Sequence, residues 1–358
     1  MESQFEIWTE KYRPEKLDDV LENPEVISVL KSFRDNKNFP HLLINGPSGS
    51  GRLTAILSFL RELYGDAYGL NTFYINSNDD KTYYQEYLDY WYDMIKIELL
   101  RTKGYSKEPS NLDLLHGMIK LFAKKKSLGE LPYKTLVIND AHLLTKMTQQ
   151  ALRRIMEKNV RTFRIILITE SLSKIIDPIR SRCMILNFKK FSNNSIIRLI
   201  KMISKEEKFE ITDEAIRAIL YLSKRNLKKV INFLQAGASV SRQVDFPLIQ
   251  EIYENISPKI KFKKIITACM FSNFNAIRDN VRKLFLEFGY DGKRIIEELN
   301  EEFLLLPYPE NIKTQFQIFF SDADNQLNTA LSEEVHIYYI LAKISRYFRD
   351  ELEKLAEA

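Results

Sequence analysis

Residues 46–54 read Gly46-Pro47-Ser48-Gly49-Ser50-Gly51-Arg52-Leu53-Thr54. They follow an apolar run, residues 41–46, which indicates a buried strand, and they precede a segment with helical character. A strand, a glycine-rich turn and a helix in this order are typical of a P-loop, in which backbone N–H groups and the helix N-terminus bind phosphate. We therefore predict that all nine positions belong to a nucleotide-binding site. An ordinary glycine turn is the alternative interpretation.

The predicted site departs from the usual pattern at four positions that carry chemistry. Arg52 stands where a P-loop has lysine, and Leu53 stands where a serine or threonine hydroxyl would bind magnesium. Farther along the chain, an apolar run ends in Asn139 and Asp140, where the Asp-Glu pair of a magnesium-binding strand is usual. Asn139 lacks the charge that magnesium prefers, and Asp140 is one methylene shorter than glutamate. The pattern predicts a site that retains a nucleotide, binds magnesium poorly and hydrolyses the nucleotide slowly or not at all.

A third motif lies near residue 180. Ser181-Arg182-Cys183 stands between the fourth and fifth predicted strands. An arginine at this place can project across a subunit interface to a neighbour's terminal phosphate, which is the role of an arginine finger. The alternative is an ordinary surface charge.

The pattern of apolar residues divides the chain into three parts. Up to about residue 190, helical segments alternate with five apolar runs that predict buried strands, namely residues 41–46, 72–76, 134–140, 164–169 and 184–188. This alternation predicts a five-stranded parallel α/β sheet over residues 1–190. Residues 191–240 predict three amphipathic helices. Residues 241–358 predict a helical domain with breaks near Pro258 and near residues 289–292, 307–309 and 322–324.

Composition excludes several other classes of protein. The chain has 358 residues, of which 45% are hydrophobic, and its formal net charge is +5. Two cysteines and four scattered histidines cannot form a disulfide framework or a zinc site, so no metal centre is predicted. The first residues carry acids and no apolar run, and no stretch approaches the roughly 18 apolar residues of a membrane span. We expect a multidomain protein of a reducing compartment, with no membrane partner.

Several sequence boxes occur in a familiar order. They are residues 8–14 (Trp-Thr-Glu-Lys-Tyr-Arg-Pro), 40–47 (Pro-His-Leu-Leu-Ile-Asn-Gly-Pro), 150–158 (Gln-Ala-Leu-Arg-Arg-Ile-Met-Glu-Lys) and 181–183 (Ser-Arg-Cys). Together they resemble the small subunits of replication factor C, the eukaryotic clamp loader of the AAA+ family. The motifs cover roughly residues 5–240, and the helical remainder is similar in pattern only. The resemblance implies an AAA+ domain, a three-helix lid and an all-helical collar domain.

The resemblance also implies roles for single residues. Tyr12, Arg13 and Pro14 would line the adenine and phosphate side of a pocket for ADP or ATP, although a simple N-terminal anchor is the alternative. Lys228 stands where the lid of this family usually has an arginine that senses the nucleotide. Glu170 stands where a polar residue would contact the terminal phosphate, and an acid at this place repels phosphate.

Three basic residues are further candidates. Arg153 and Arg154 follow the third predicted strand on a helix, where they could contact DNA, the adjacent nucleotide site or solvent alone. Lys81 precedes the aromatic segment 83–92 and is a candidate phosphate contact. A packed hairpin or a partner surface is the preferred interpretation of that segment, ahead of base stacking.

Within the family, the chain resembles the terminal small subunit, whose own ATP site is degenerate. The resemblance implies a nuclear heteropentamer that loads a sliding clamp onto primer–template DNA in replication and repair. Its partners would be the other replication factor C subunits, the clamp and, through the complex, DNA. Two alternatives stay open: an authentic ATPase subunit, and a scaffold subunit that binds no nucleotide.

Overall fold

The computed structural model describes residues 6–77, 111–124, 126–327 and 330–357. Lys81 and the aromatic segment 83–92 lie outside the described residues. The chain forms two compact units, Met1–Ile249 and Gln250–Ala358. The finer division at residues 190 and 240 stays a prediction.

The first unit contains a five-stranded parallel sheet with the order β2-β3-β4-β1-β5. Its strands are β1 (Leu42–Asn45), β2 (Thr72–Asn76), β3 (Lys134–Asn139), β4 (Phe163–Thr169) and β5 (Met184–Asn187). The predicted sheet is therefore confirmed, and each strand agrees with its predicted range to within two residues at either end.

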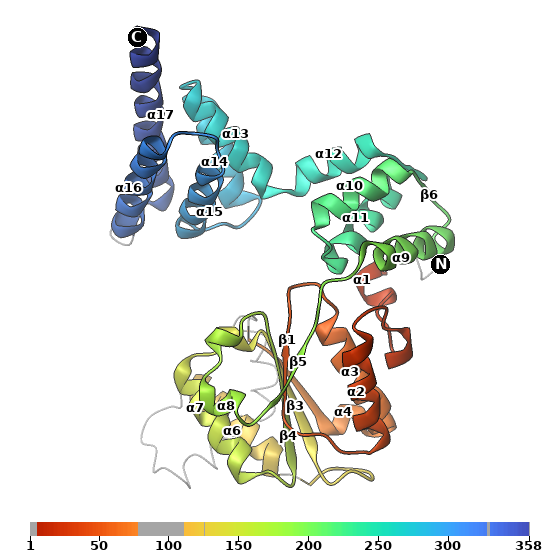
Figure 1. Ribbon diagram of the computed structural model, residues 1–358. Coiled ribbons are helices and arrows are strands. Elements are labelled where there is room, and N and C mark those ends of the chain that lie inside the picture. The colour runs from red at the N-terminus through yellow and green to blue at the C-terminus, as the bar shows by residue number, and fades with distance from the viewer. Residues whose placement is uncertain (1–5, 78–110, 125, 328–329, 358) are drawn as a thin grey trace. The chain divides into compact units, whose positions relative to one another are not determined.

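Alternation of side chains along each strand builds two apolar layers. In β1, Leu42 and Ile44 pack with the helices of one face, whereas Leu43 packs with those of the other face. Figure 1 shows the helices on both sides of the sheet. The first face is covered by α2 (Pro24–Asp35), α3 (Arg52–Tyr64) and α4 (Tyr68–Asn71), and the second by α6 (Asn111–Lys124), α7 (Lys146–Lys158) and α8 (Asp177–Arg180). Because both faces are covered, the strands read as continuous apolar runs.

Three helices follow the sheet in the same unit, as predicted: α9 (Asn193–Glu206), α10 (Asp213–Ser223) and α11 (Leu227–Val240). Each begins after a capping side chain that accepts a backbone N–H of the first turn, from Ser192, Thr212 and Asn226 respectively. The sequence did not predict the parallel pair β6 (Glu210–Ile211) and β7 (Gln243–Val244). Strands of two residues are too short to show alternation.

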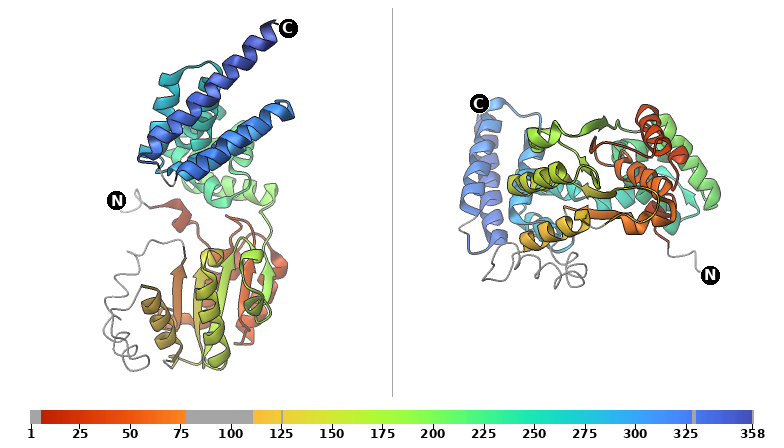
Figure 2. Two further views of the ribbon diagram at one scale, coloured as in Figure 1. Left: turned by 90° about the vertical axis from the view of Figure 1, so that its left-hand side faces the viewer. Right: turned by 90° about the horizontal axis from the view of Figure 1, so that it is seen from below.

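The second unit is helical. The boundary between the units falls within α12 (Phe246–Ile256), and the unit continues with α13 (Pro258–Met270), α14 (Phe274–Leu286), α15 (Gly292–Leu304), α16 (Glu310–Leu327) and α17 (Glu333–Glu357). The helices α13, α14, α15, α16 and α17 share one apolar core. Figure 2 shows α16 and α17 as two long helices. The break predicted near residues 322–324 is wrong, because Asp322 and Asp324 lie on the exposed face of α16 while Ala323 is buried.

Candidate nucleotide-binding site

A cavity of about 1290 Å³ lies at the carboxyl edge of the sheet in the first unit. Three segments reach it directly after strands: the P-loop after β1, Asn139 and Asp140 at the end of β3, and Glu170 after β4. Most sequence-predicted site residues line it, namely Tyr12, Arg13, Pro14, Ser48, Gly49, Ser50, Gly51, Arg52, Leu53, Thr54, Asn139, Asp140 and Lys228. Gly46 and Pro47 precede this lining and connect it to β1.

The P-loop backbone depends on its glycines. Gly49 and Gly51 have φ angles of +69° and +80°, in the region that L side chains rarely adopt. At Gly46, a Cβ atom would lie 2.8 Å from the carbonyl oxygen of Phe188, the residue after β5, so only glycine fits here. Gly51 is the N-cap of α3, and its carbonyl accepts the N–H of Ala55 at 2.9 Å. The loop therefore delivers the N-terminus of a long helix to the cavity.

One polar group of the P-loop has no hydrogen-bond partner among the described residues. Ser50 is 2% exposed, and its Oγ finds no hydrogen-bond partner among the described residues. A buried hydroxyl without a partner is costly, and a phosphate oxygen would satisfy it. Together with the positive end of α3, this orphaned group fits a phosphate-bearing ligand. Residues 48–54 would hold it.

The Arg52 side chain bonds to groups of the protein itself and does not take the place of a P-loop lysine. Its guanidinium donates one hydrogen bond to the carbonyl oxygen of Thr169 and another to Glu170 Oε1, at 2.9 Å. The Arg52 side chain is only 8% exposed, whereas that of Glu170 is 39% exposed. The cation at the phosphate end of the cavity is thus already paired inside the chain.

The end of β3 does not fit a magnesium ion. Asn139 Nδ2 donates to Asp140 Oδ2 at 3.0 Å and to Asn76 Oδ1 at 3.3 Å. Leu53, also at the cavity, has no oxygen in its side chain. Among the described residues no group of three or more His, Cys, Asp or Glu side chains could hold a metal ion.

The N-terminal box connects the cavity to the helices that follow the sheet. Tyr12 donates its hydroxyl proton to Glu207 Oε1 at 2.6 Å, and Lys11 Nζ lies 2.7 Å from the same oxygen. Burial, followed by the Glu207 carboxylate, raises the pKa of Tyr12, so the hydroxyl stays protonated. Trp8 stacks on Phe209 with 6.0 Å between ring centroids. This N-terminal box therefore lines the cavity and also anchors its end of the chain to the helices. The sequence had left these two interpretations as alternatives.

The lid helix α11 contacts the P-loop directly. The N–H of Leu227, at the first position of α11, donates to the carbonyl oxygen of Gly49 at 3.2 Å. A Cβ atom on Gly49 would lie 2.1 Å from Asn226 Oδ1, which shows how closely the loop and the lid approach. Lys228 is exposed one position farther along the helix. This direct contact sets the distance between Lys228 and the P-loop.

Arg182 lies on the surface, between α8 and β5. Its guanidinium is 2.7 Å from Glu157 Oε1 on α7 and donates to the carbonyl oxygen of Pro178 at 2.7 Å. Arg153 Nε donates to the same Glu157 oxygen at 3.0 Å. Arg154 is exposed on the same helix. These attractions lower the pKa of Glu157, with Arg153 the largest cause, so the carboxylate is charged at neutral pH.

The sequence did not predict Glu207 as the partner of Tyr12 or Glu157 as the partner of Arg182. Glu207 follows α9 with no motif to distinguish it. Glu157 stands four residues after Arg153, a spacing that brings helical side chains together, and this signal could have identified that pair.

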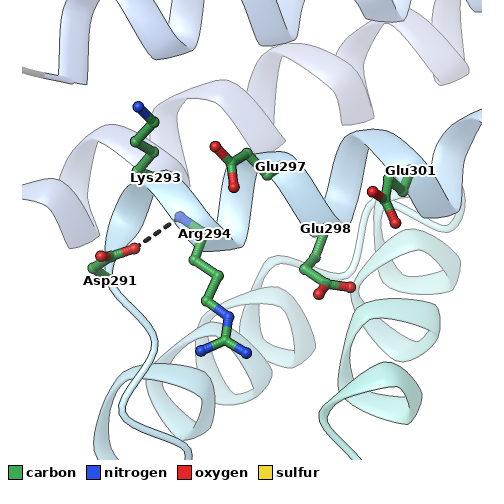
Figure 3. Close-up of a pocket in the computed structure, with 6 residues that line it drawn as sticks. All are labelled: Asp291, Lys293, Arg294, Glu297, Glu298 and Glu301. Atoms are coloured by element: carbon green, nitrogen blue, oxygen red, sulfur yellow. Dashed lines mark hydrogen bonds between the residues drawn. The ribbon is translucent and has the colours of Figure 1, made fainter. Parts of the chain in front are cut away.

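A second hollow of about 350 Å³ lies along α15 in the other unit (Figure 3). Its lining consists only of charged residues of this helix and its N-cap: Asp291, Lys293, Arg294, Glu297, Glu298 and Glu301. Asp291 Oδ1 caps the helix by accepting the N–H of Arg294 at 2.8 Å. We interpret it as a solvated helix surface.

The strand order, the P-loop after β1 and the helical lid that contacts it define an AAA+ P-loop protein. The family model described as "DNA polymerase III, delta subunit" matches residues 22–192, and the model described as "Replication factor C C-terminal domain" matches residues 257–343. The chain belongs to the replication factor C small-subunit family, the AAA+ clamp loaders of DNA replication.

Related proteins and one solved structure support these assignments. The replication factor C small subunit of Archaeoglobus fulgidus is 30% identical over 95% of this chain and 98% of its own. The replication factor C small subunit of Methanococcus vannielii is 31% identical over 94% of this chain and 98% of its own length. The structure of a mutant RuvB of Thermotoga maritima matches with a TM-score of 0.51 at 16% identity, over 77% of this chain and 88% of that chain. This likeness concerns the fold alone. In the described residues, no helix is both long enough and apolar enough to cross a membrane.

Proposed function

We propose that the chain is a non-hydrolysing subunit of a five-subunit sliding-clamp loader. It binds ADP or ATP at its own P-loop and supplies Arg182 as an arginine finger to the ATP site of a neighbouring subunit. Its family membership supports assembly with other replication factor C subunits. The resemblance to the eukaryotic terminal subunit supports a nuclear loader that opens the clamp and places it on primer–template DNA in replication and repair.

The observation that carries the non-hydrolysing part is the state of the groups at the carboxyl edge of the sheet. Magnesium binding and water activation need a charged, available carboxylate at the end of β3. Here Asn139 is neutral, and its amide donates to Asp140. Arg52 is paired with Glu170, and Leu53 offers no hydroxyl. The residues that remain can bind and orient a nucleotide, but they cannot form the usual metal site.

The surroundings of Arg182 support the finger. Its side chain is 39% exposed, and the Glu157 side chain that pairs with it is 38% exposed. An exposed ion pair contributes about 0–1 kcal/mol, so a neighbour's phosphate can replace Glu157 as the partner at small cost. Until then, Glu157 and the carbonyl of Pro178 hold the guanidinium at the surface.

The test is the ATPase of the reconstituted five-subunit assembly in the presence of clamp and primer–template DNA. An arginine finger contributes about 10³–10⁵ to turnover in related reactions, so Arg182→Ala should remove the contribution of one neighbouring site. Arg180→Ala is the matched control, because Arg180 pairs with exposed Asp177 in the same short segment. Unchanged turnover of an intact Arg182→Ala assembly would refute the finger.

Two further measurements separate the alternatives. Turnover of ATP by the isolated chain would favour an authentic ATPase. Binding of no adenine nucleotide by the purified chain would favour a nucleotide-free scaffold. Failure of the full chain to bind ADP in a calorimetric titration would establish that reading.

A further inference from the structure

We propose that Glu157 is a positioning residue that prepares Arg182 to act on a neighbouring subunit. It holds the Arg182 guanidinium at the surface before transfer to a phosphate, and Arg153 keeps its carboxylate paired after transfer. The inference rests on the proposed finger role of Arg182 and adds the residues of this chain through which that role is prepared.

One oxygen of Glu157 contacts both arginines. Glu157 Oε1 lies 2.7 Å from Arg182 Nη2 and accepts a hydrogen bond from Arg153 Nε at 3.0 Å. The other oxygen, Oε2, accepts from Arg153 Nη2 at 3.5 Å. Arg153 thus faces the carboxylate with two nitrogens and Arg182 with one, and the two-nitrogen arrangement orients a guanidinium more firmly. Arg182 is therefore the partner that can leave.

Both ends of this contact are attached to well-packed backbone. Glu157 lies in the last turn of α7, next to Ile155 and Met156, which are buried in the second apolar layer. The N–H of Arg182 donates to the carbonyl oxygen of Ile179 at 3.0 Å, and Ile179 is buried in the same layer. The helices α7 and α8 lie on one face of the sheet (Figure 1). What remains free is the Arg182 side chain, and Glu157 selects among its orientations.

A neutral side chain at position 157 would leave two like charges close together. Arg153 and Arg182 reach the same carboxylate oxygen, so their guanidinium groups are neighbours. Like charges repel, and an exposed arginine has many rotamers through which it can move away. The carbonyl oxygen of Pro178 would then be the larger part of what holds Arg182 in place. The finger would have to be ordered anew at each encounter with a phosphate, and this ordering opposes turnover.

Transfer of Arg182 to a phosphate does not leave Glu157 unpaired. Both side chains are exposed, so water replaces the contact that is lost. Arg153 stays bonded to Glu157, because a spacing of four residues places the two side chains together on α7. Arg153 is also the larger cause of the lowered pKa of Glu157, so the carboxylate stays charged after Arg182 has left. Glu157 can therefore hold the finger before transfer and release it at small cost.

The experiment uses the reconstituted five-subunit assembly with clamp and primer–template DNA. The turnover that Arg182→Ala removes defines the finger-dependent turnover, and Glu157→Ala should lower this part about tenfold. Glu157→Gln keeps an oxygen that accepts from Arg182 but loses the charge, so we expect a smaller loss, of about threefold. The KM for ATP should change less than about twofold, because Glu157 positions Arg182 and does not bind ATP. Glu214→Ala is the matched control, since Glu214 pairs with Arg217 on exposed α10.

A double variant separates positioning from a structural role. If Glu157 acts only through Arg182, Glu157→Ala should have no effect in an assembly that already carries Arg182→Ala. A further loss in the double variant would overturn the inference, because Glu157 would then support the assembly independently of the finger. Higher turnover with Glu157→Ala than with the wild type would also overturn it, since Glu157 would then be a competitor that withholds Arg182 from the phosphate.

The outcomes also distinguish this inference from the proposed function. Loss of turnover with Arg182→Ala but not with Glu157→Ala would overturn the inference and leave the finger in place. No loss with Arg182→Ala would refute the finger, and the inference would fail with it. If Glu157→Ala does not assemble, as judged by size-exclusion chromatography, Glu157→Gln takes its place. Unchanged finger-dependent turnover in that variant would contradict the proposal.

Discussion

Two arginine–glutamate pairs lie in different surroundings in the same unit. Arg52 is 8% exposed and is bonded to both Glu170 and the Thr169 carbonyl at the cavity rim. Arg182 is 39% exposed and shares Glu157 with another arginine at the surface. The two carboxylates are about equally exposed, so the pairs differ in their arginines: Arg52 is packed inside the protein, whereas water reaches Arg182. The first arginine is therefore fixed by its packing, and the second can exchange its partner at small cost.

The largest expected effect is that of removing the buried arginine. Arg52→Ala should lower the free energy of unfolding by about 3 kcal/mol, because the protein loses a charged hydrogen bond to the Thr169 carbonyl and the packing of a buried side chain. Urea denaturation followed by circular dichroism measures this difference. Arg217→Ala breaks an exposed pair with Glu214 and serves as the control. A loss below about 1 kcal/mol for Arg52→Ala would remove the contrast between the two arginines.

A smaller effect should follow from separating the P-loop and the lid. Gly49→Ala forces a side chain into a φ of +69° and toward Asn226, and we expect a loss of about 2 kcal/mol. Hydrogen exchange at the Leu227 amide should become faster, since its acceptor is the Gly49 carbonyl. Gly289→Ala, at a φ of +62° in open space after α14, isolates the backbone term of about 1 kcal/mol. Equal losses for the two variants would show that the lid does not constrain the loop.

The smallest effect is expected at the surface. Arg182→Ala should change the free energy of unfolding by less than about 1 kcal/mol, because both members of its ion pair are exposed. Glu157→Gln, the matched change on the other partner, should behave in the same way in the same urea titration. A loss above about 2 kcal/mol for either variant would mean that this pair is structural and not exchangeable.

Much of the sheet domain could be predicted from the sequence. The central strands β1, β3 and β4 are largely buried on both faces, so they read as short apolar runs, and the glycines of the P-loop mark the turn that follows the first strand. The helices of the lid were predictable from their spacing and from caps such as Thr212 and Asn226. The error at residues 322–324 arose because charged residues on an exposed helix face resemble a break.

The orientation of site side chains could not be predicted in the same way. Arg52 and Glu170 each depart from the family pattern, and the sequence presents them as two separate changes. Only the neighbouring positions of β1 and β4 in the sheet bring their side chains within 2.9 Å. The pairing of Arg182 with Glu157 likewise depends on the packing of α8 against α7. Such contacts depend on tertiary structure, which no local pattern encodes.

The anchoring of Trp8 has a consequence for the synthesis of the chain. The backbone N–H of Trp8 donates to Gln235 Oε1 at 3.0 Å, and Gln235 in turn donates to the carbonyl of Glu6, so the contact spans 227 positions. At about 5–20 residues per second, roughly 10–45 s separate the translation of the two partners. During that interval neither Phe209 nor Gln235 is available as a partner for Trp8. The segment around Trp8 therefore leaves the ribosome before the rest of its unit and is among the last parts of that unit to be secured.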